Sequence, residues 1–270
     1  MNRNHAAALA ALVMLCAAAL PLAAQGRDRG RPGTQTPSVP QEPSTAAPSD
    51  FTYSESNGGI TITAYTGAGG NVIIPARING KPVTAIGERA FFGRQNITGV
   101  TIPDGVTATG KQAFMNCRSL AAVTIPASVT VIGDQSFRAC PALTAVTIPD
   151  GVTVIGYMAF SYSGLTAVTI PGSVTALENG AFERCDGLVS VTIGSGVKSI
   201  GSYAFNGCTA LTSVTFRGAI PQGSFYLNSF PSGLRDAFYA ANAAAGTPGT
   251  YTRPNRTSMR WTLSFAALFD

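Results

Sequence analysis

The side chains that could carry out chemistry are few in this chain of 270 residues. The single histidine, His5, lies in an apolar N-terminal stretch that we expect to be removed, so the remaining chain has none. Without an imidazole, Ser-His-Asp and Cys-His nucleophile systems and histidine-ligated metal sites are excluded. We therefore assign no catalytic residue, no metal ligand and no cofactor.

Charged residues make up only 11% of the chain, and hydrophobic residues make up 45%. The net charge is +5, and it falls to +4 when Arg3 leaves with the N-terminal stretch. A nucleic-acid-binding protein normally shows clustered Lys and Arg. A small excess of positive charge therefore does not indicate a nucleic-acid partner. The composition suits a well-buried, β-rich protein.

The elements that must position any functional side chain repeat along the sequence. From Val83 to Phe216 the pattern is P-x-x-V-T-x-I-G-x-x-[AS]-F-x-x-C-x-x-L-x-x-V-T-I. Its phenylalanines are 22 or 23 residues apart: Phe91, Phe114, Phe137, Phe160, Phe182 and Phe205. A fixed period of about 20 to 29 residues is typical of solenoids, whose units bury their apolar faces against their neighbours. We predict a β-rich solenoid, a right-handed coil of 22–23-residue repeats with N- and C-terminal caps.

The sequence of each repeat predicts a short strand, then a turn, and then a second pair of inward-pointing apolar side chains. Val146 and Ile148 should point inward while Ala145 and Thr147 point outward, because side chains alternate along a strand. A small residue precedes each phenylalanine, which leaves room for the rings to stack along the axis. We interpret this row of phenylalanines as core and not as a ligand-binding aromatic box.

The repeat resembles the BspA-like, treponemal-type leucine-rich repeats of bacterial surface proteins. The resemblance rests on I-G-x-x-A-F at 86–91, 155–160 and 200–205, on a cysteine three residues after Phe, and on L-x-x-V-T-I-P. The approach ITITAYTGAGGNVIIPARINGKPVTAIG looks like the N-terminal cap of that family. The resemblance implies a leucine-rich-repeat solenoid that is secreted or surface-exposed, and several members are adhesins.

Some copies depart from the pattern. Thr109 replaces the inward isoleucine in the second copy, and Leu177-Glu178 replaces Ile-Gly in the fifth. The copy after Phe160 is one residue short and lacks its cysteine. We expect the coils to be least regular around repeats four and five.

The cysteines Cys117, Cys140, Cys185 and Cys208 share one position of the repeat. Coils stacked about 4.8 Å apart would bring each consecutive pair, Cys117 with Cys140 and Cys185 with Cys208, near disulfide distance. Export would permit such bonds. The alternative, which we favour, is a row of buried thiols that behave as small apolar side chains.

Two other kinds of surface are open as alternatives. A glycan-binding or carbohydrate-active β-solenoid would need converging carboxylates, but Asp104 and Asp150 share a position two coils apart. An outward row of threonines invites comparison with ice-binding lattices: Thr101, Thr124, Thr147, Thr169, Thr192 and Thr215. Threonine is also an ordinary solvent-facing strand residue.

The candidate partner-binding surface consists of variable side chains at the edge of the coils. Exposed tyrosine, methionine and arginine are typical of protein interfaces. The residues are Tyr157, Met158, Tyr162, Arg94, Arg118, Arg138, Arg184 and Tyr203.

The ends of the chain predict the remaining organisation. Residues 1–24 read as a signal peptide and 25–50 as a disordered Pro/Ser/Thr-rich linker. We assign 51–85 to an N-terminal cap, 86–217 to the leucine-rich repeats, and 218–270 to a C-terminal cap with a short helix.

The expected protein is exported, non-enzymatic and without a membrane span after signal cleavage. It would be secreted, held at the cell surface or periplasmic. We expect it to bind or adhere to a protein partner, either host matrix or another cell-surface protein.

Overall fold

The structure, a computed structural model, describes residues 45–231 and 233–264. The predicted signal peptide and the linker up to residue 44 lie outside the described residues. The last part of the predicted linker is ordered, because Thr45 bridges Ile73 and a short 3-10 helix, η1, spans Pro48–Asp50. The ordered chain thus begins before the boundary at residue 51 that the composition suggests.

Strands dominate the described residues. The N-terminal cap holds β1 (Phe51–Ser56), β2 (Gly59–Tyr65), β3 (Gly70–Ile73), β4 (Arg77–Ile78) and β5 (Lys81–Ile86). The V-T-I segments of the repeats form β6 (Ile97–Thr101), β8 (Ala122–Thr124), β11 (Ala167–Ile170), β13 (Ser190–Ile193) and β15 (Ser213–Phe216). The segments that end at the Ile-Gly position of the motif form β7 (Ala108–Thr109), β9 (Val131–Ile132), β10 (Val154–Ile155), β12 (Ala176–Leu177) and β14 (Ser199–Ile200). The C-terminal part adds η2 (Gln222–Ser224), α1 (Leu234–Tyr239), β16 (Gly249–Thr252) and β17 (Thr262–Ser264).

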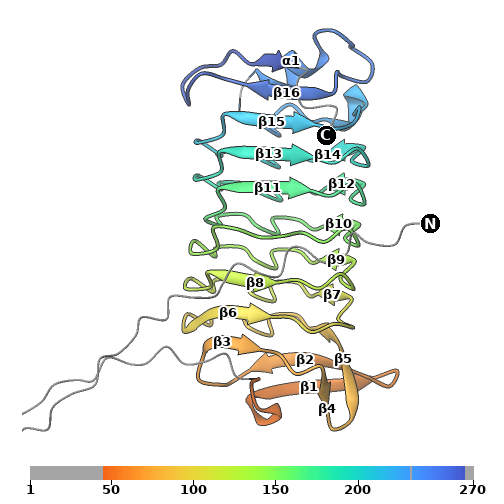
Figure 1. Cartoon of the computed structure of the whole chain (residues 1–270), viewed down its shortest axis with the longest axis vertical. Helices are drawn as coiled ribbons and strands as arrows, with labels where there is room; N and C mark the ends of the chain where they lie inside the picture. The colour runs from red at the N-terminus through yellow and green to blue at the C-terminus, as the bar shows by residue number, and fades with distance from the viewer. Residues whose placement is uncertain (1–44, 232, 265–270) are drawn as a thin grey trace, which may run out of the picture. The chain divides into compact units, whose positions relative to one another are not determined.

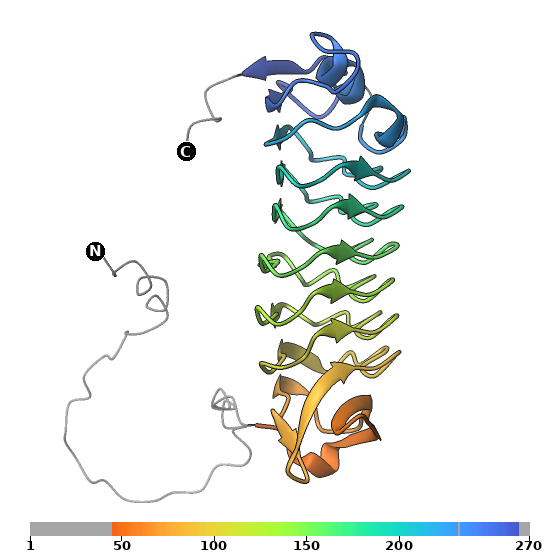
Figure 2. The ribbon, with the colours of Figure 1, turned by 90° about the vertical axis from the view of Figure 1, so that its right-hand side faces the viewer.

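The strands of successive repeats lie side by side as the rungs of a solenoid (Figure 1). Each pairs in parallel with the strand one repeat away, always at the same motif position, so that Ile155 aligns with Ile132 and with Leu177. One sheet runs in the order β1-β2-β5-β7-β9-β10-β12-β14. A second sheet holds β11-β13-β15-β16-β17. A third contains β3-β6-β8. The predicted β-rich solenoid is therefore confirmed, and Figure 2 shows its coils from the side. We number the coils by their phenylalanines, from Phe91 in coil 1 to Phe205 in coil 6.

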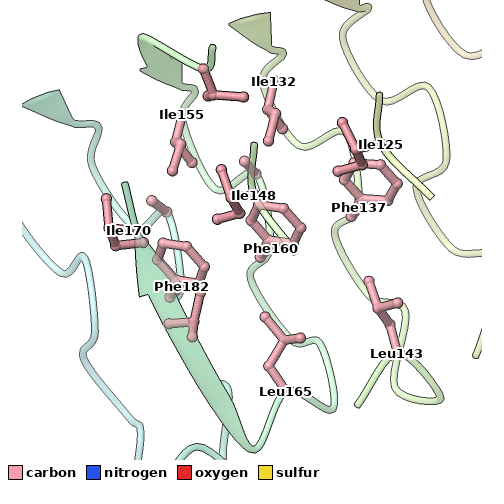
Figure 3. Close-up of a cluster of buried hydrophobic side chains, with 14 of the residues drawn as sticks. Ile125, Ile132, Phe137, Leu143, Ile148, Ile155, Phe160, Leu165, Ile170 and Phe182 are labelled. Carbon is pink, nitrogen blue, oxygen red and sulfur yellow. The ribbon is translucent and has the colours of Figure 1, made fainter. Parts of the chain in front are cut away.

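The phenylalanines form a continuous stack inside the solenoid. Their ring centroids lie 4.8 to 5.3 Å apart, and all six side chains are fully buried. Figure 3 shows Phe137, Phe160 and Phe182 in one row, with Ile132 and Ile155 pointing into the same interior. Offset ring stacking and burial both favour this arrangement, so these residues are core, as the spacing predicts.

Both ends of the stack are closed by aromatic rings from the caps. Tyr65 stacks on Phe91 at 5.2 Å, and Phe230 stacks on Phe205 at 4.5 Å. The chain around Phe230 repeats the motif geometry, because Phe225 bridges Ile200 and the Phe205 N–H donates to Ser229 O. Residues 225–230 are thus a partial seventh coil, beyond the boundary at residue 217 that the pattern suggests.

Each coil turns its corner through two residues in the left-handed backbone region. One lies two residues before the phenylalanine and has φ between 51° and 66° in coils 4 to 6: Met158, Gly180 and Tyr203. The other lies two residues after it, as at Tyr162 and Arg184. Left-handed backbone is costly for bulky residues and free for glycine. These positions project side chains out of the coil without contributing them to the core.

The row of V-T-I strands is interrupted in coil 3, where residues 144–149 carry no strand. Strand arrows are missing there between β8 and β11 in Figure 1. The one-residue-short loop of coil 4 follows directly, and a Cβ on its Gly164 would collide with the Pro141 carbonyl oxygen. The irregularity therefore lies one coil earlier than the sequence departures suggest, where two loops of unequal length must pack.

Candidate partner-binding surface

The two positions before the small residue and phenylalanine line one edge of the solenoid. We call this row the variable edge: Glu88-Arg89, Lys111-Gln112, Asp134-Gln135, Tyr157-Met158, Asn179-Gly180, Ser202-Tyr203 and Leu227-Asn228. Coils 1 to 3 contribute charged and amide side chains, whereas the later coils contribute tyrosine, methionine and leucine. The edge is thus divided into a charged half and an aromatic half.

The aromatic half exposes large side chains that have no place in the core. Tyr157 is 41% exposed, Tyr203 is 47% exposed and Leu227 is 73% exposed. Leu227 and its exposed neighbour Tyr226 were not among the predicted residues. The signal was present, since F-Y-L-N-S-F at 225–230 matches I-G-x-x-[AS]-F except at its first two positions.

A hollow of about 370 Å³ opens between Tyr157 and Tyr203. It spans coil 5, where the edge position is Gly180 and no side chain fills the space. Met158 and Glu183 also line it. The structure therefore brings three of the predicted residues, Tyr157, Met158 and Tyr203, around one concavity.

A second cluster lies around Tyr162, at the other corner position. The guanidinium carbons of Arg138 and Arg184 lie 5.7 and 5.3 Å from the Tyr162 ring centroid. Because these residues come from coils 3, 4 and 5, the ring lies between two cations. Glu183 connects the clusters, since its carbonyl oxygen accepts the Tyr162 N–H while its side chain lines the hollow.

The other two predicted arginines do not join either cluster. Arg94 and Arg118 lie in coils 1 and 2, at different distances after their phenylalanines. Neither lines the hollow, and neither is in contact with the Tyr162 ring. Arg94 and Arg118 therefore stay predicted surface residues outside the two clusters described.

The four cysteines are buried free thiols. Each Sγ donates to the carbonyl oxygen of the phenylalanine in the preceding coil, at 3.0 Å for Cys117 and 3.2 Å for Cys208. Ser163 occupies the same position in coil 4, 3.2 Å from the Cys185 Sγ. Burial raises the pKa of the Cys117 thiol to about 12. The favoured reading, a ladder of structural thiols, therefore describes these cysteines.

The alternative chemistries find little support in the geometry. Within residues 45–231 and 233–264, no three His, Cys, Asp or Glu side chains gather as metal ligands would. The threonine row aligns Thr101 with Thr124 and Thr169 with Thr192, but it is broken in coil 3. At its end the Thr215 hydroxyl is hydrogen-bonded to the Thr250 hydroxyl at 2.8 Å. In the described residues the strand pairings therefore align the threonines in two separate groups, before and after coil 3.

The fold and the surface define a leucine-rich-repeat β-solenoid that carries its variable side chains on one edge. The chain belongs to the BspA-type leucine-rich repeat family, whose profile matches six copies over residues 71–189 and 178–232. A search of curated proteins gives no match. In the described residues no helix has both the length and the apolar character needed to cross a membrane.

Solved structures of bacterial repeat proteins are similar. A leucine-rich repeat protein of T. pallidum is 33% identical, with a TM-score of 0.62 over 63% of this chain and 81% of that one. One from Bacteroides ovatus is 29% identical, with a TM-score of 0.57, 61% of this chain being covered. A leucine rich cell surface protein from Faecalibacterium prausnitzii is 34% identical, with a TM-score of 0.51 over 66% of this chain. The chain spans only 45% and 56% of the last two proteins.

Proposed function

We propose that this protein is a non-catalytic interaction module that binds another protein through the aromatic half of its variable edge together with the cluster around Tyr162. The observation that supports this best is the set of three exposed tyrosines that coils 4 and 6 contribute: Tyr157, Tyr162 and Tyr203. Tyrosine and arginine are enriched among the residues that dominate the energetics of protein interfaces, and tyrosine buries much area at little entropic cost. The flanking Arg138 and Arg184 add the second of these residue types.

The backbone adds an independent argument for this surface. Tyr162 and Tyr203 have φ of 59° and 62°, a conformation in which a bulky side chain costs free energy and glycine does not. Glycine does occupy the equivalent positions in other coils, at Gly180 and Gly207. Because both rings are exposed, tyrosine at these positions does not stabilise the core. A role in binding accounts for tyrosine in place of glycine.

We further propose an adhesive role at the cell surface, directed at host matrix or at another cell-surface protein. Export through residues 1–24 would carry the solenoid out of the cytoplasm, with residues 25–44 as a linker ahead of it. Membership of the BspA-type family and the likeness to a leucine rich cell surface protein support this placement.

The test is a solid-phase binding screen against purified matrix and cell-surface proteins. We expect saturable binding that is lost, by about a hundredfold or more in affinity, in the double variant Tyr162→Gly/Tyr203→Gly. The matched control, Arg89→Gly/Asn116→Gly, places glycine at the same two left-handed positions in coils 1 and 2. No saturable partner, or equal loss in both variants, would contradict the proposal.

A further inference from the structure

The hollow between Tyr157 and Tyr203 has the features of a site for a positively charged group. It exists because coil 5 carries Gly180 between two coils with large side chains at the same position. A Cβ on Gly180 would lie 3.0 Å from the Met158 Cγ, so any larger residue there would fill the space. Neighbouring coils show that this position accepts side chains, as Gln135 and Met158 do.

A carboxylate faces this space. The Glu183 Oε2 would lie 3.4 Å from a Cβ on Gly180, which puts the charge over the floor of the hollow. Across residues 45–231 and 233–264 the ion pair that forms is Lys81 with Glu55, so Glu183 has no cation in contact. The adjacent Arg184 has its guanidinium over the Tyr162 ring instead. The negative charge in the hollow is therefore available to a ligand.

The backbone around the hollow has little hydrogen-bonding capacity to spare. The Asn179 Oδ1 accepts the Ser202 N–H at 2.8 Å, and the Gly180 N–H donates to Ser202 O. The Tyr157 N–H donates to the Asp134 Oδ1 at 2.9 Å. A carboxylate beside two electron-rich rings and a thioether favours a cation. A sugar would have to pair with the side chains of the lining instead, and methyl glucoside tests this alternative below.

We propose that this hollow binds a lysine or arginine side chain of the protein partner. The aliphatic stem would pack on Met158 and the rings of Tyr157 and Tyr203, and the charged end would pair with Glu183. Aromatic faces and a thioether are polarisable surfaces that favour such a group. This inference rests on the proposed function, since it names the chemistry of the partner at one place on the binding edge.

The test uses the full chain with methionine methyl groups labelled for NMR. The chain has five methionines, and Met158 lines the hollow while Met115, in coil 2, serves as an internal reference. The probes are Gly-Lys-Gly and Gly-Arg-Gly blocked at both ends, with Gly-norleucine-Gly and methyl glucoside as comparisons. We expect the Lys and Arg peptides alone to shift the Met158 signal saturably, with Met115 unmoved.

Two variants decide the role of the named groups. Glu183→Gln keeps the shape and removes the charge, and it should weaken peptide binding by about tenfold or more. Gly180→Asn fills the hollow with a residue that accepts left-handed backbone, and it should abolish the shift. The control is Glu88→Gln, which removes a carboxylate from the charged half of the same edge and should change nothing.

Three outcomes would overturn the inference. They are an equal response to the norleucine peptide, a Met158 shift with methyl glucoside in place of the cationic peptides, and unchanged binding in Glu183→Gln. Failure of this inference can be distinguished from failure of the proposed function. If a protein partner is lost in Tyr162→Gly/Tyr203→Gly but retained in Glu183→Gln, the surface is right and the cation site is wrong.

Discussion

At the scale of single residues, two departures from the motif in neighbouring coils interact with each other. Thr109 is fully buried where the pattern has isoleucine, and its hydroxyl accepts the Ser136 hydroxyl at 2.9 Å. Ser136 is itself one of the small residues that precede phenylalanine, and it is also fully buried. The two departures therefore form one hydrogen-bonded pair, although 27 residues separate them in the sequence.

Replacing Thr109 alone by the motif residue should destabilise the protein. Thr109→Ile leaves the Ser136 hydroxyl buried without its partner, which costs about 1 to 3 kcal/mol of unfolding free energy. The double variant Thr109→Ile/Ser136→Ala should return close to the original stability because no polar atom is left unpaired. Urea denaturation of the four proteins gives the coupling energy, and additive effects would show that the pair does not matter.

The buried thiols predict a loss of stability in alkali. In the folded chain the pKa of Cys117 is raised from 9.0 to about 12. As the pH rises, the unfolded chain thus releases the proton first. The contribution of this thiol to the unfolding free energy is therefore complete below pH 9.0 and is lost as the pH rises toward 12. One such thiol should lower the unfolding free energy by about 1.4 kcal/mol per pH unit in that window.

Cys117→Ser isolates this effect, because Ser163 shows that a hydroxyl fits the same position. We expect the variant to lose stability less steeply than the parent between pH 9 and 10.5 in urea titrations. Parallel curves for the two proteins would show that the thiol stays accessible to base.

At the scale of elements, the partial seventh coil completes the stack of rings. Phe230 is 5% exposed and covers Phe205, and its ring also lies 6.0 Å from Phe216 and 5.6 Å from Phe225. We expect Phe230→Ala to cost about 3 to 5 kcal/mol, as for large cavities in a core. Leu227→Ala, three residues away on the exposed edge, should change stability by less than about 0.5 kcal/mol. Calorimetry of both variants measures the contrast, and a small effect of Phe230→Ala would mean that the cap is held elsewhere.

The interrupted sheet predicts uneven protection along the solenoid. Strands β11 and β13 pair through four aligned residues, whereas residues 144–149 carry no strand. Amide hydrogen exchange should be at least about tenfold faster at 144–148 than at 167–170, because exchange follows local opening. Equal protection would place the weak point elsewhere.

Sequence reasoning was most reliable where every copy shares a residue. The spacing of the phenylalanines predicts the stack and the coil, because each ring must meet the next at one position. It could not predict the Thr109–Ser136 pair, which depends on two departures meeting across coils. It also missed the seventh coil, since Phe225 and Tyr226 replace the Ile-Gly that marks the motif.

The candidate surface was predictable as a set of positions and not as a shape. Tyr157 and Tyr203 could be placed on one edge from the repeat alone. The hollow between them depends on Gly180 and on the direction of the Glu183 side chain, which no periodicity reveals. Similarly, four of the candidate arginines follow a phenylalanine in the sequence, but the spacing does not indicate which of them lie over the Tyr162 ring, as Arg138 and Arg184 do.

At the scale of the whole molecule, each coil contacts mainly its two neighbours, so whole coils should be removable. Deleting Phe92–Phe137 joins Phe91 to Arg138 in register and removes Thr109 and Ser136 together. We expect a folded, shorter solenoid of lower stability that still binds the partner, because repeat stabilities are roughly additive. Circular dichroism and the binding screen test this. An unfolded product would show that coils 2 and 3 are needed by the rest.

The regular spacing of the stacked rings also sets a distance scale along the edge. Along the solenoid the rings recur every 5.2 Å in coils 4 to 6, and the turns of an α-helix recur every 5.4 Å or so. A helix lying parallel to the solenoid axis would therefore stay in phase with the coils, presenting one side chain to each. An extended strand, whose same-face side chains are about 6.6 Å apart, would drift out of step within two coils. The ring spacing would therefore match the pitch of a helical partner more closely than that of an extended one.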